Sequence, residues 1–215
     1  ELTKRDLSRT AGLSWSTVSK IVGRFERSGL VKRTGTARRA AQDGGKNAYL
    51  YALDDGYGHV LGMDVEYGRT RVVAKALSGT VLRTAESSSP SQPSLERFLD
   101  FAVGAARAAS PGLPGRLLGI GVGMPLWMVR GGSAARREIF RRVERGLTGR
   151  LDIPASVHNN VRAYATYLAH ERRRAGDFLL VTIRTGLGFA VHVGGAVMPG
   201  GDGLAGELAH FQIDP

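Results

Sequence analysis

Residues 12–31 read GLSWSTVSKIVGRFERSGLV, and this stretch predicts a helix with a defined start and a defined end. Ser14 suits the N-cap, because its hydroxyl can accept a hydrogen bond from a free N–H of the first turn. Gly29 suits the end, because glycine readily adopts the left-handed backbone that often follows a helix. Apolar residues recur at three- and four-residue spacing, which predicts one buried stripe: Val18, Ile21, Val22 and Phe25.

A shorter helix is expected just before this one. Thr3 and Asp6 have the spacing of a capping box. Leu7 and Ala11 share one face, and Gly12 suits the turn that follows. Two helices joined by so tight a turn predict a helix-turn-helix. An ordinary helical hairpin with a polar outer face is the alternative.

The outer face of the second helix carries small hydroxyls and a cation at its N-terminal end. A recognition helix enters the major groove with that end, where short donors reach base edges and phosphates. We therefore expect DNA contacts from six residues: Ser14, Trp15, Ser16, Thr17, Ser19 and Lys20.

A basic stretch follows, between two expected strands. Val31 begins one strand, and residues 49–53 suggest the next. This pattern predicts the wing of a winged helix, whose cations usually contact phosphate or the minor groove. The cations expected near its tip are Arg38, Arg39 and Lys46. A solvated loop is the alternative.

The net charge of the 215-residue chain is +11, and most of the excess lies in the first quarter. Residues 1–53 hold eleven Lys and Arg against four Asp and Glu, whereas residues 54–215 hold nineteen against fifteen. A small basic module in front of a more neutral one indicates a nucleic-acid partner. An Arg-rich solvated surface would give the same balance, so charge alone leaves both open.

Composition also excludes some classes of protein. The chain has no cysteine, so it contains neither disulfides nor thiolate metal ligands. It has no run of about 18 apolar residues, so we expect no transmembrane helix and no membrane partner. No signal-peptide pattern is present, and a cytoplasmic location is the expectation.

Residues 54–215 predict an α/β domain. Strands of alternating polarity are expected from residue 58, then a helix over 94–109, a buried strand that ends in GIGVGMP (119–125) and a basic helix over 134–149. A short strand, a further helix and two more strands follow. This order predicts a sheet that mixes antiparallel and parallel strands. Ligands bind such sheets at the carboxyl ends of strands, at three candidate loops here: after Gly123, at Asn159–Asn160 and at Thr185–Gly188.

The asparagine pair stands out within SVHNNVRAYA, residues 156–165. One asparagine would serve as an N-cap. An amide can also bind a hydroxyl, but it cannot act as a general base. The pair therefore indicates a binding site, with a role limited to capping as the alternative.

Three motifs of the second region, GIGVGMP, TGLG (185–188) and GGDGLAGELAHFQIDP (200–215), resemble those of the ROK family (repressor, open reading frame, kinase). Together with GLSWSTVSKIVGRFERSGLV, they resemble its regulator branch. The resemblance implies a winged helix-turn-helix over 1–53, followed over 54–215 by an actin-like, ribonuclease H-like sugar-kinase domain. It also implies that the second lobe is incomplete, because family members continue into a Cys-rich zinc loop.

The resemblance also implies roles for individual residues. Asn159, Asn160, Glu207 and His210 are expected to hold sugar hydroxyls, with Asn160 replacing the family's catalytic aspartate. In the family that histidine also ligates a structural zinc, so His210 would bind metal only if an absent Cys-rich loop completed the site. We expect no cofactor in this chain and no catalytic residue.

Two phosphate-binding loops depart from the family pattern. The first has Asp64-Val65-Glu66 where sugar kinases have Asp-x-Gly, and a carboxylate there disfavours phosphate. The second begins with Arg184 in place of a glycine. The residues kept in these degenerate loops are Asp64, Thr185, Gly186 and Gly188.

We therefore expect a transcriptional regulator, a repressor, whose pocket binds an effector without phosphorylating it. Its expected partners are double-stranded operator DNA, a sugar or sugar-phosphate effector, and further copies in a homodimer or homotetramer. An ATP-dependent sugar kinase of the glucokinase or N-acetylhexosamine kinase type, with a DNA-binding domain attached, is the alternative. A constitutive DNA-binding protein with a vestigial pocket is a third reading.

Overall fold

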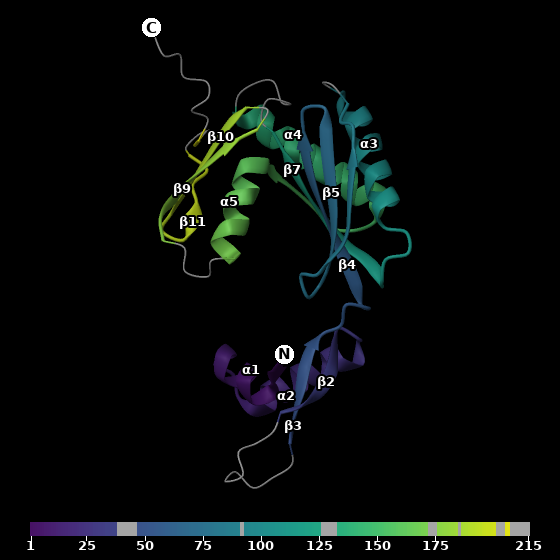
Figure 1. Ribbon diagram of the computed structural model, residues 1–215, viewed down its shortest axis with the longest axis vertical. Helices are drawn as coiled ribbons and strands as arrows, with labels where there is room; N and C mark the ends of the chain where they lie inside the picture. Colours follow the sequence, from purple (N-terminus) through teal and green to yellow (C-terminus); the bar gives the residue numbers. More distant parts are fainter. Residues whose placement is uncertain are drawn as a thin grey trace. The chain divides into compact units, whose positions relative to one another are not determined.

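A computed structural model describes residues 1–37, 47–90, 93–125, 133–171, 176–184, 186–200 and 205–206 (Figure 1). The chain divides into two compact units. The first comprises Glu1–His59, Lys75–Leu82 and Gly112–Leu117, and the second comprises Val60–Ala74, Arg83–Pro111 and Leu118–Pro215. No described helix is long and apolar enough to cross a membrane.

The first unit contains two helices and a three-stranded sheet. The helices are α1 (Lys4–Ala11) and α2 (Trp15–Arg27). The strands, β1 (Leu2–Thr3), β2 (Val31–Ala37) and β3 (Ala48–Leu53), pair antiparallel in the order β1-β3-β2. The helix-turn-helix and the two wing strands predicted from the sequence are thus confirmed, and the wing tip lies outside the described residues.

The predicted helix ends are also confirmed. Thr3 and Asp6 form a capping box at α1, and Gly12 follows that helix with a left-handed φ of 64°. The Ser14 hydroxyl accepts a hydrogen bond from the Thr17 N–H at the start of α2. Short polar side chains at these positions therefore fix where each helix begins.

The buried stripe of α2 is narrower than predicted. Val18 and Val22 are buried and pack with Tyr51, Leu7 and Val31. Ile21 and Phe25 were expected in the same stripe, but they are 37% and 43% exposed. The physical reason is that Leu7 of α1 and the sheet residues Val31 and Tyr51 pack against Val18 and Val22.

The second unit is built on a five-stranded sheet of order β6-β5-β4-β7-β8. Some strand ends of this sheet, near residues 58, 76, 82 and 116, belong to the first unit. Its strands are β4 (Gly58–Glu66), β5 (Arg69–Ala76), β6 (Val81–Ser87), β7 (Arg116–Met124) and β8 (Ala155–Asn159). Turns of two and four residues join β4, β5 and β6, which requires antiparallel pairing. β7 and β8 pair in parallel, with Gly123 opposite His158. The mixed sheet predicted from the sequence is therefore confirmed.

Alternate residues of the central strands face opposite sides of this sheet. Leu61, Met63 and Val65 of β4 are at most 2% exposed. The helices α3 (Leu95–Ala109) and α4 (Ser133–Leu151) contribute further buried residues, Phe98, Leu99, Val143 and Leu147 among them. The other side of β4 carries Gly62 and Asp64, which line a pocket.

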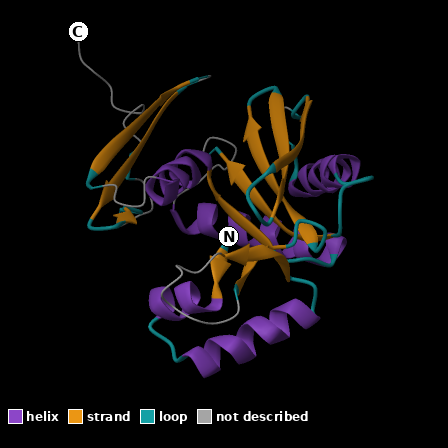
Figure 2. Cartoon of the chain, turned by 60° about the horizontal axis from the view of Figure 1, so that its bottom comes forward, coloured by secondary structure: helices purple, strands orange, loops and turns teal. Residues whose placement is uncertain are grey.

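Helix α5 (Asn160–Glu171) follows β8 directly and leads to a second sheet. That sheet has the order β11-β10-β9, with β9 (Phe178–Ile183), β10 (Leu187–Val193) and β11 (Ala196–Val197) antiparallel. Figure 1 shows α5 between the two sheets, and Figure 2 shows the strands of this unit gathered into two separate groups. Residue 188 can approach α5 only as glycine, because an added Cβ would lie 2.6 Å from a Val161 methyl.

Candidate functional site

The second unit holds a pocket of about 420 Å³. Strands β4, β5 and β7 supply its floor, α5 supplies one wall, and β9 with the residue after it supplies the polar end. The pocket therefore includes the start of α5, where the sequence predicted a binding site, and Asp64, Thr182 and Arg184 at its polar end.

Three glycines leave parts of the floor of this pocket without side chains, which makes room for a ligand. Gly62, Gly121 and Gly123 all line it. A Cβ at position 123 would lie 3.2 Å from both Cα and Cβ of Asn160, and 3.7 Å from Oδ1 of Asp64. The glycine thus lets β7 lie close to the first turn of α5, which brings Asn160 next to Asp64.

The two asparagines lie in different surroundings. Asn159 is buried, 8% exposed, and its Oδ1 accepts a hydrogen bond of 3.1 Å from the Arg162 N–H. That bond to the third helical residue is typical of an N-cap. Asn160 instead lines the pocket, and its Oδ1 lies 2.9 Å from the Val161 N–H. Both side-chain oxygens therefore accept backbone N–H groups at the start of α5, and Asn160 in addition lines the pocket.

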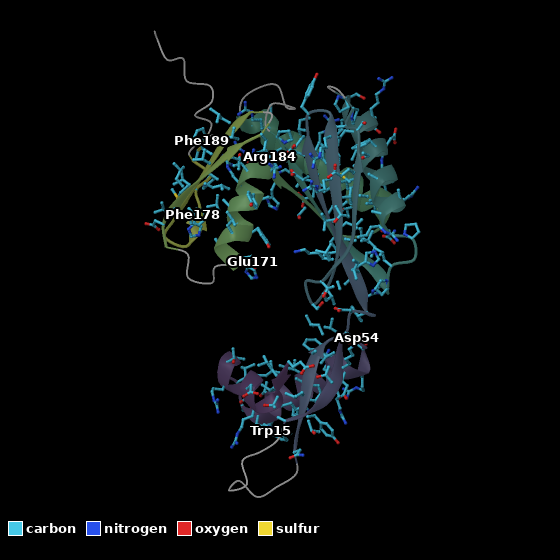
Figure 3. All side chains as sticks on the ribbon, viewed as in Figure 1. Trp15, Asp54, Glu171, Phe178, Arg184 and Phe189 are labelled. Carbon is cyan, nitrogen blue, oxygen red and sulfur yellow. The ribbon has the colours of Figure 1, made fainter. Side chains whose placement is uncertain are left out.

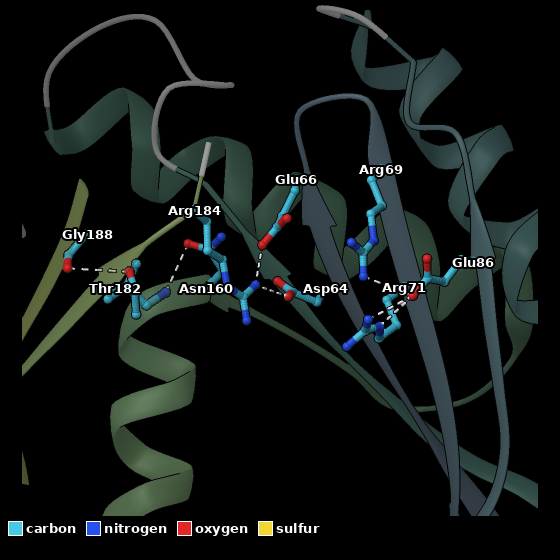
Figure 4. Close-up of polar contacts among 10 residues, drawn as sticks. Asp64, Glu66, Arg69, Arg71, Glu86, Asn160, Thr182, Arg184 and Gly188 are labelled. Atoms are coloured by element: carbon cyan, nitrogen blue, oxygen red, sulfur yellow. Dashed lines mark hydrogen bonds and ion pairs between the residues drawn. The ribbon is translucent and has the colours of Figure 1, made fainter. Parts of the chain in front are cut away.

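Three charged groups meet at the polar end of the pocket (Figure 4). Arg184 Nη1 donates a hydrogen bond of 2.8 Å to Asp64 Oδ2, and the same nitrogen pairs with Glu66 Oε1. The hydrogen bond with Asp64, followed by that with Glu66, raises the pKa of Arg184 above its ordinary value. This cluster links the second sheet to β4, across about 120 residues of sequence.

A second arginine lines the pocket and is also paired within the chain. Arg71 on β5 lies 2.8 Å from Glu86 of β6, and Arg69 lies 2.9 Å from the same carboxylate (Figure 4). The two guanidiniums lower the pKa of Glu86, mainly through the Arg71 hydrogen bond. The arginines and carboxylate that line the described pocket are therefore already engaged with one another or with Glu86.

An aromatic pair forms part of the α5 wall. Tyr164 and Tyr167 both line the pocket, with ring centroids 6.4 Å apart and planes 9° from parallel. They are 43% and 46% exposed. Such rings offer flat apolar surfaces with a polar tip, which suit the faces and hydroxyls of a sugar ring.

The predicted DNA-reading residues lie at the start of α2, in the first unit. Trp15 is 62% exposed and is marked in Figure 3. Ser16, Thr17 and Lys20 are also exposed. Ser14 and Ser19 are engaged locally, because the Ser14 hydroxyl caps α2 and the Ser19 hydroxyl accepts a 3.2 Å hydrogen bond from Lys4 Nζ.

Some predicted site residues fall outside the described residues: Arg38, Arg39, Lys46, Thr185, Glu207 and His210. Gly186 and Gly188 are described, and the Gly186 carbonyl accepts a 3.0 Å hydrogen bond from the Arg184 N–H. Sequence reasoning missed the roles of Arg71, Tyr164 and Tyr167 in the pocket. Tyr164 and Tyr167 have the three-residue spacing of one helix face, a signal that could have identified them.

The zinc site implied by the resemblance is not formed by the described residues. Three or more His, Asp or Glu side chains do not come together anywhere in that part of the chain. The sequence has no cysteine to serve as a thiolate ligand. His210, the one predicted metal ligand, lies outside the described residues.

Comparison with known proteins identifies the family. The ROK family model matches residues 61–215, which is most of the chain, and a winged helix-turn-helix DNA-binding model matches residues 1–32. The chain belongs to the ROK family. The resemblance stated from the sequence motifs is thereby confirmed, as is the N-terminal helix-turn-helix.

Among curated relatives, the xylose repressor of Bacillus subtilis (strain 168) is 24% identical over 225 residues. The match covers 99% of this chain and 57% of that repressor. The xylose repressor of Bacillus spizizenii is also 24% identical, with the same coverage. The chain thus spans a little over half the length of the curated relatives it matches.

Two solved structures share the fold. A ROK family transcriptional regulator, a homologue of the E. coli MLC protein, superposes over 100% of this chain and 56% of its own, with a TM-score of 0.72 and 22% identity. A ROK family glucokinase from Streptomyces griseus, solved with glucose and AMPPNP, covers 74% of this chain and 52% of its own, with a TM-score of 0.57 and 21% identity. The regulator likeness extends through the helix-turn-helix.

Proposed function

We propose that this protein is a DNA-binding transcriptional regulator of the repressor type, whose ROK domain binds a sugar effector without phosphorylating it. One observation carries the proposal: curated repressors align with 99% of the chain, including the helix-turn-helix. The exposed N-terminal turn of α2, with Trp15, Ser16, Thr17 and Lys20, would contact operator DNA.

The pocket supports binding rather than catalysis. Phosphorylation of a sugar hydroxyl calls for a base that takes its proton, and loss of such a base typically lowers the rate about 10²–10⁴-fold. Asn160 offers an amide at the pocket, which can orient a hydroxyl but cannot accept its proton. Asp64 is the carboxylate that lines the described pocket, and Arg184 already pairs with it.

The proposed partners follow from the same reasoning. Operator DNA would be bound by two copies, because helix-turn-helix proteins commonly bind paired half-sites. A sugar or sugar phosphate would occupy the pocket, with Asn160 and the tyrosines of α5 as contacts. Glu207 and His210 remain proposed contacts of the sugar, and the wing cations remain proposed contacts of the DNA. This function needs no cofactor in the chain, and it belongs in the compartment that holds the DNA, the cytoplasm.

The test is binding of the chain to DNA from upstream of its own gene, followed by fluorescence anisotropy at several salt concentrations with and without a panel of sugars. We expect binding that weakens steeply with salt and that one sugar changes. Lys20→Ala should weaken binding to all sequences and reduce the salt slope by about 1. Arg145→Ala is the matched control, because Arg145 is exposed on α4 and pairs with Glu138.

Two outcomes would overturn the proposal. The first is binding no stronger than to scrambled DNA at low salt. The second is ATP-dependent phosphorylation of glucose, N-acetylglucosamine or N-acetylmannosamine that is lost on Asn160→Ala. If DNA binds but no sugar alters it or raises the melting temperature, the protein is a constitutive DNA-binding protein.

A further inference from the structure

The polar end of the pocket places one guanidinium nitrogen between two carboxylates. Asp64 and Glu66 are two residues apart on β4, so their side chains leave the same face of the strand. Asp64 Oδ2 lies 2.8 Å from Arg184 Nη1, and Glu66 Oε1 contacts that same nitrogen. Oxygens from two different side chains therefore converge on a single positively charged atom.

Convergent carboxylate oxygens are also what a hard divalent cation requires. Mg²⁺, Mn²⁺ and Ca²⁺ prefer carboxylate, carbonyl and water oxygens, and they complete their coordination with water where the protein leaves room. The Asp64 and Arg184 side chains are 39% and 49% exposed, so water reaches the cluster. The Arg184 nitrogen thus occupies the position that such an ion would take between these two oxygens.

The net charge of this cluster depends on whether Arg184 lies between the two carboxylates. With Arg184 in place, two carboxylates face one guanidinium, which leaves one negative charge. Without Arg184, two negative charges would face each other across a small, hydrated gap, and a divalent cation would neutralise both. The arginine stays charged at every physiological pH, so it cannot leave the cluster by losing a proton.

We infer that Arg184 is the resident cation of a two-carboxylate site and that it excludes divalent metal ions from the pocket. The exclusion concerns the cluster itself and does not depend on what the protein regulates. Its functional consequence rests on the proposed function: phosphoryl transfer from a nucleoside triphosphate relies on Mg²⁺, so a pocket that excludes Mg²⁺ binds a sugar without phosphorylating it. Arg184 would then determine which ligands the site accepts.

The experiment measures Mn²⁺ binding to the whole chain by electron paramagnetic resonance of the free ion, without DNA, nucleotide or sugar. We expect Arg184→Ala to lower the dissociation constant for Mn²⁺ at least about tenfold, which is the scale at which neighbouring side chains alter metal affinity. Adding Asp64→Asn and Glu66→Gln to Arg184→Ala should abolish the gain. Arg145→Ala, which removes an arginine from the exposed Glu138 pair, should leave Mn²⁺ binding unchanged.

Two results would overturn the inference: Arg184→Ala that binds Mn²⁺ no more tightly than the wild-type chain, or a gain that survives removal of both carboxylates. Thermal unfolding checks that each variant is folded. If Arg184→Ala is not, Arg184→Gln replaces it, because glutamine removes the charge and keeps a hydrogen-bond donor. Failure here would leave the DNA and sugar measurements intact, and failure of those would leave this result standing.

Discussion

Thr3 and Asp6 close the start of α1 with hydrogen bonds in both directions. The Asp6 N–H donates to the Thr3 hydroxyl at 3.2 Å, and the Thr3 N–H donates to Asp6 Oδ2 at 3.0 Å. The Thr3 hydroxyl also donates to that carboxylate, at 2.6 Å, and this bond is the main reason that the pKa of Asp6 lies below its ordinary value of 3.8. The charged carboxylate is therefore the form that stabilises α1.

The stability of the chain should consequently depend on the ionisation of Asp6. Because the pKa is lowered on folding, the contribution is fully present above the ordinary value and is lost as pH falls through the lowered one. We expect Asp6→Asn to lower the melting temperature at pH 7 and to differ progressively less from wild type at acid pH. Circular dichroism melts from pH 7 to pH 2 measure this difference.

Thr3→Ala provides the control, because it removes the hydroxyl that lowers the pKa. On its own, this substitution should lower the free energy of unfolding by about 0.5–2 kcal/mol, the usual effect of losing an N-cap. In that background, the pH dependence of the Asp6→Asn difference should largely disappear. A difference that persists unchanged would mean that Asp6 acts through other groups, such as Arg5 or Arg9.

Single residues show where sequence reasoning was sufficient and where it was not. The caps at Thr3 and Ser14 were predictable, because a cap acts within three residues of its own position. The sequence also indicated a binding site at the asparagine pair, with a role limited to capping as the alternative. It could not give the ion pair of Arg184 with Asp64, because that contact joins residues about 120 positions apart.

Helix α4 illustrates the same limits at the scale of an element. Two of its glycines, Gly146 and Gly149, lie three residues apart in very different surroundings. A Cβ at position 146 would lie 2.6 Å from a methyl of Leu99, which is 3% exposed within α3, whereas a Cβ at 149 would meet nothing within 4 Å. Gly146 thus lets α3 and α4 approach each other.

Alanine at these two positions should change the stability in opposite directions. In Gly146→Ala, overpacking against the buried Leu99 costs about 1–3 kcal/mol, which exceeds the helix propensity gained, so the variant is less stable than wild type. In Gly149→Ala only the gain of up to about 1 kcal/mol remains. Urea unfolding of both variants measures the free energy of unfolding, and equal shifts in one direction would contradict the packing argument.

Elements were easier to predict than the faces they bury. The helix expected over 134–149 extends over Ser133–Leu151, and the strands around Gly186 form as predicted. The exposure of Ile21 and Phe25 was not foreseen, because periodicity gives the side of a helix that is apolar but not how much of it other elements cover. Tertiary contacts decide that.

At the scale of the whole molecule, sequence order and charge indicated a basic DNA-binding module followed by an α/β domain. Family models now match both regions, over residues 1–32 and 61–215. The boundary between 53 and 54 stays a prediction, and so do the roles of the wing cations and of Glu207 and His210. The wing cations, Glu207 and His210 lie outside the described residues.

The proposed function requires that the pocket be coupled to the DNA-contacting surface, and thermodynamics makes such coupling reciprocal. If an effector sugar changes the affinity for operator DNA by some factor, operator DNA must change the affinity for that sugar by the same factor. We expect coupling of about 5–150-fold, the usual range for allosteric proteins. Calorimetry of sugar binding, with and without saturating operator DNA, measures one side of this cycle, and anisotropy measures the other.

Two variants provide the controls. Tyr164→Ala should weaken sugar binding with and without DNA, whereas Lys20→Ala should weaken only DNA binding. Sugar affinities that are identical with and without DNA would show that the pocket does not control DNA binding, even if both ligands bind tightly.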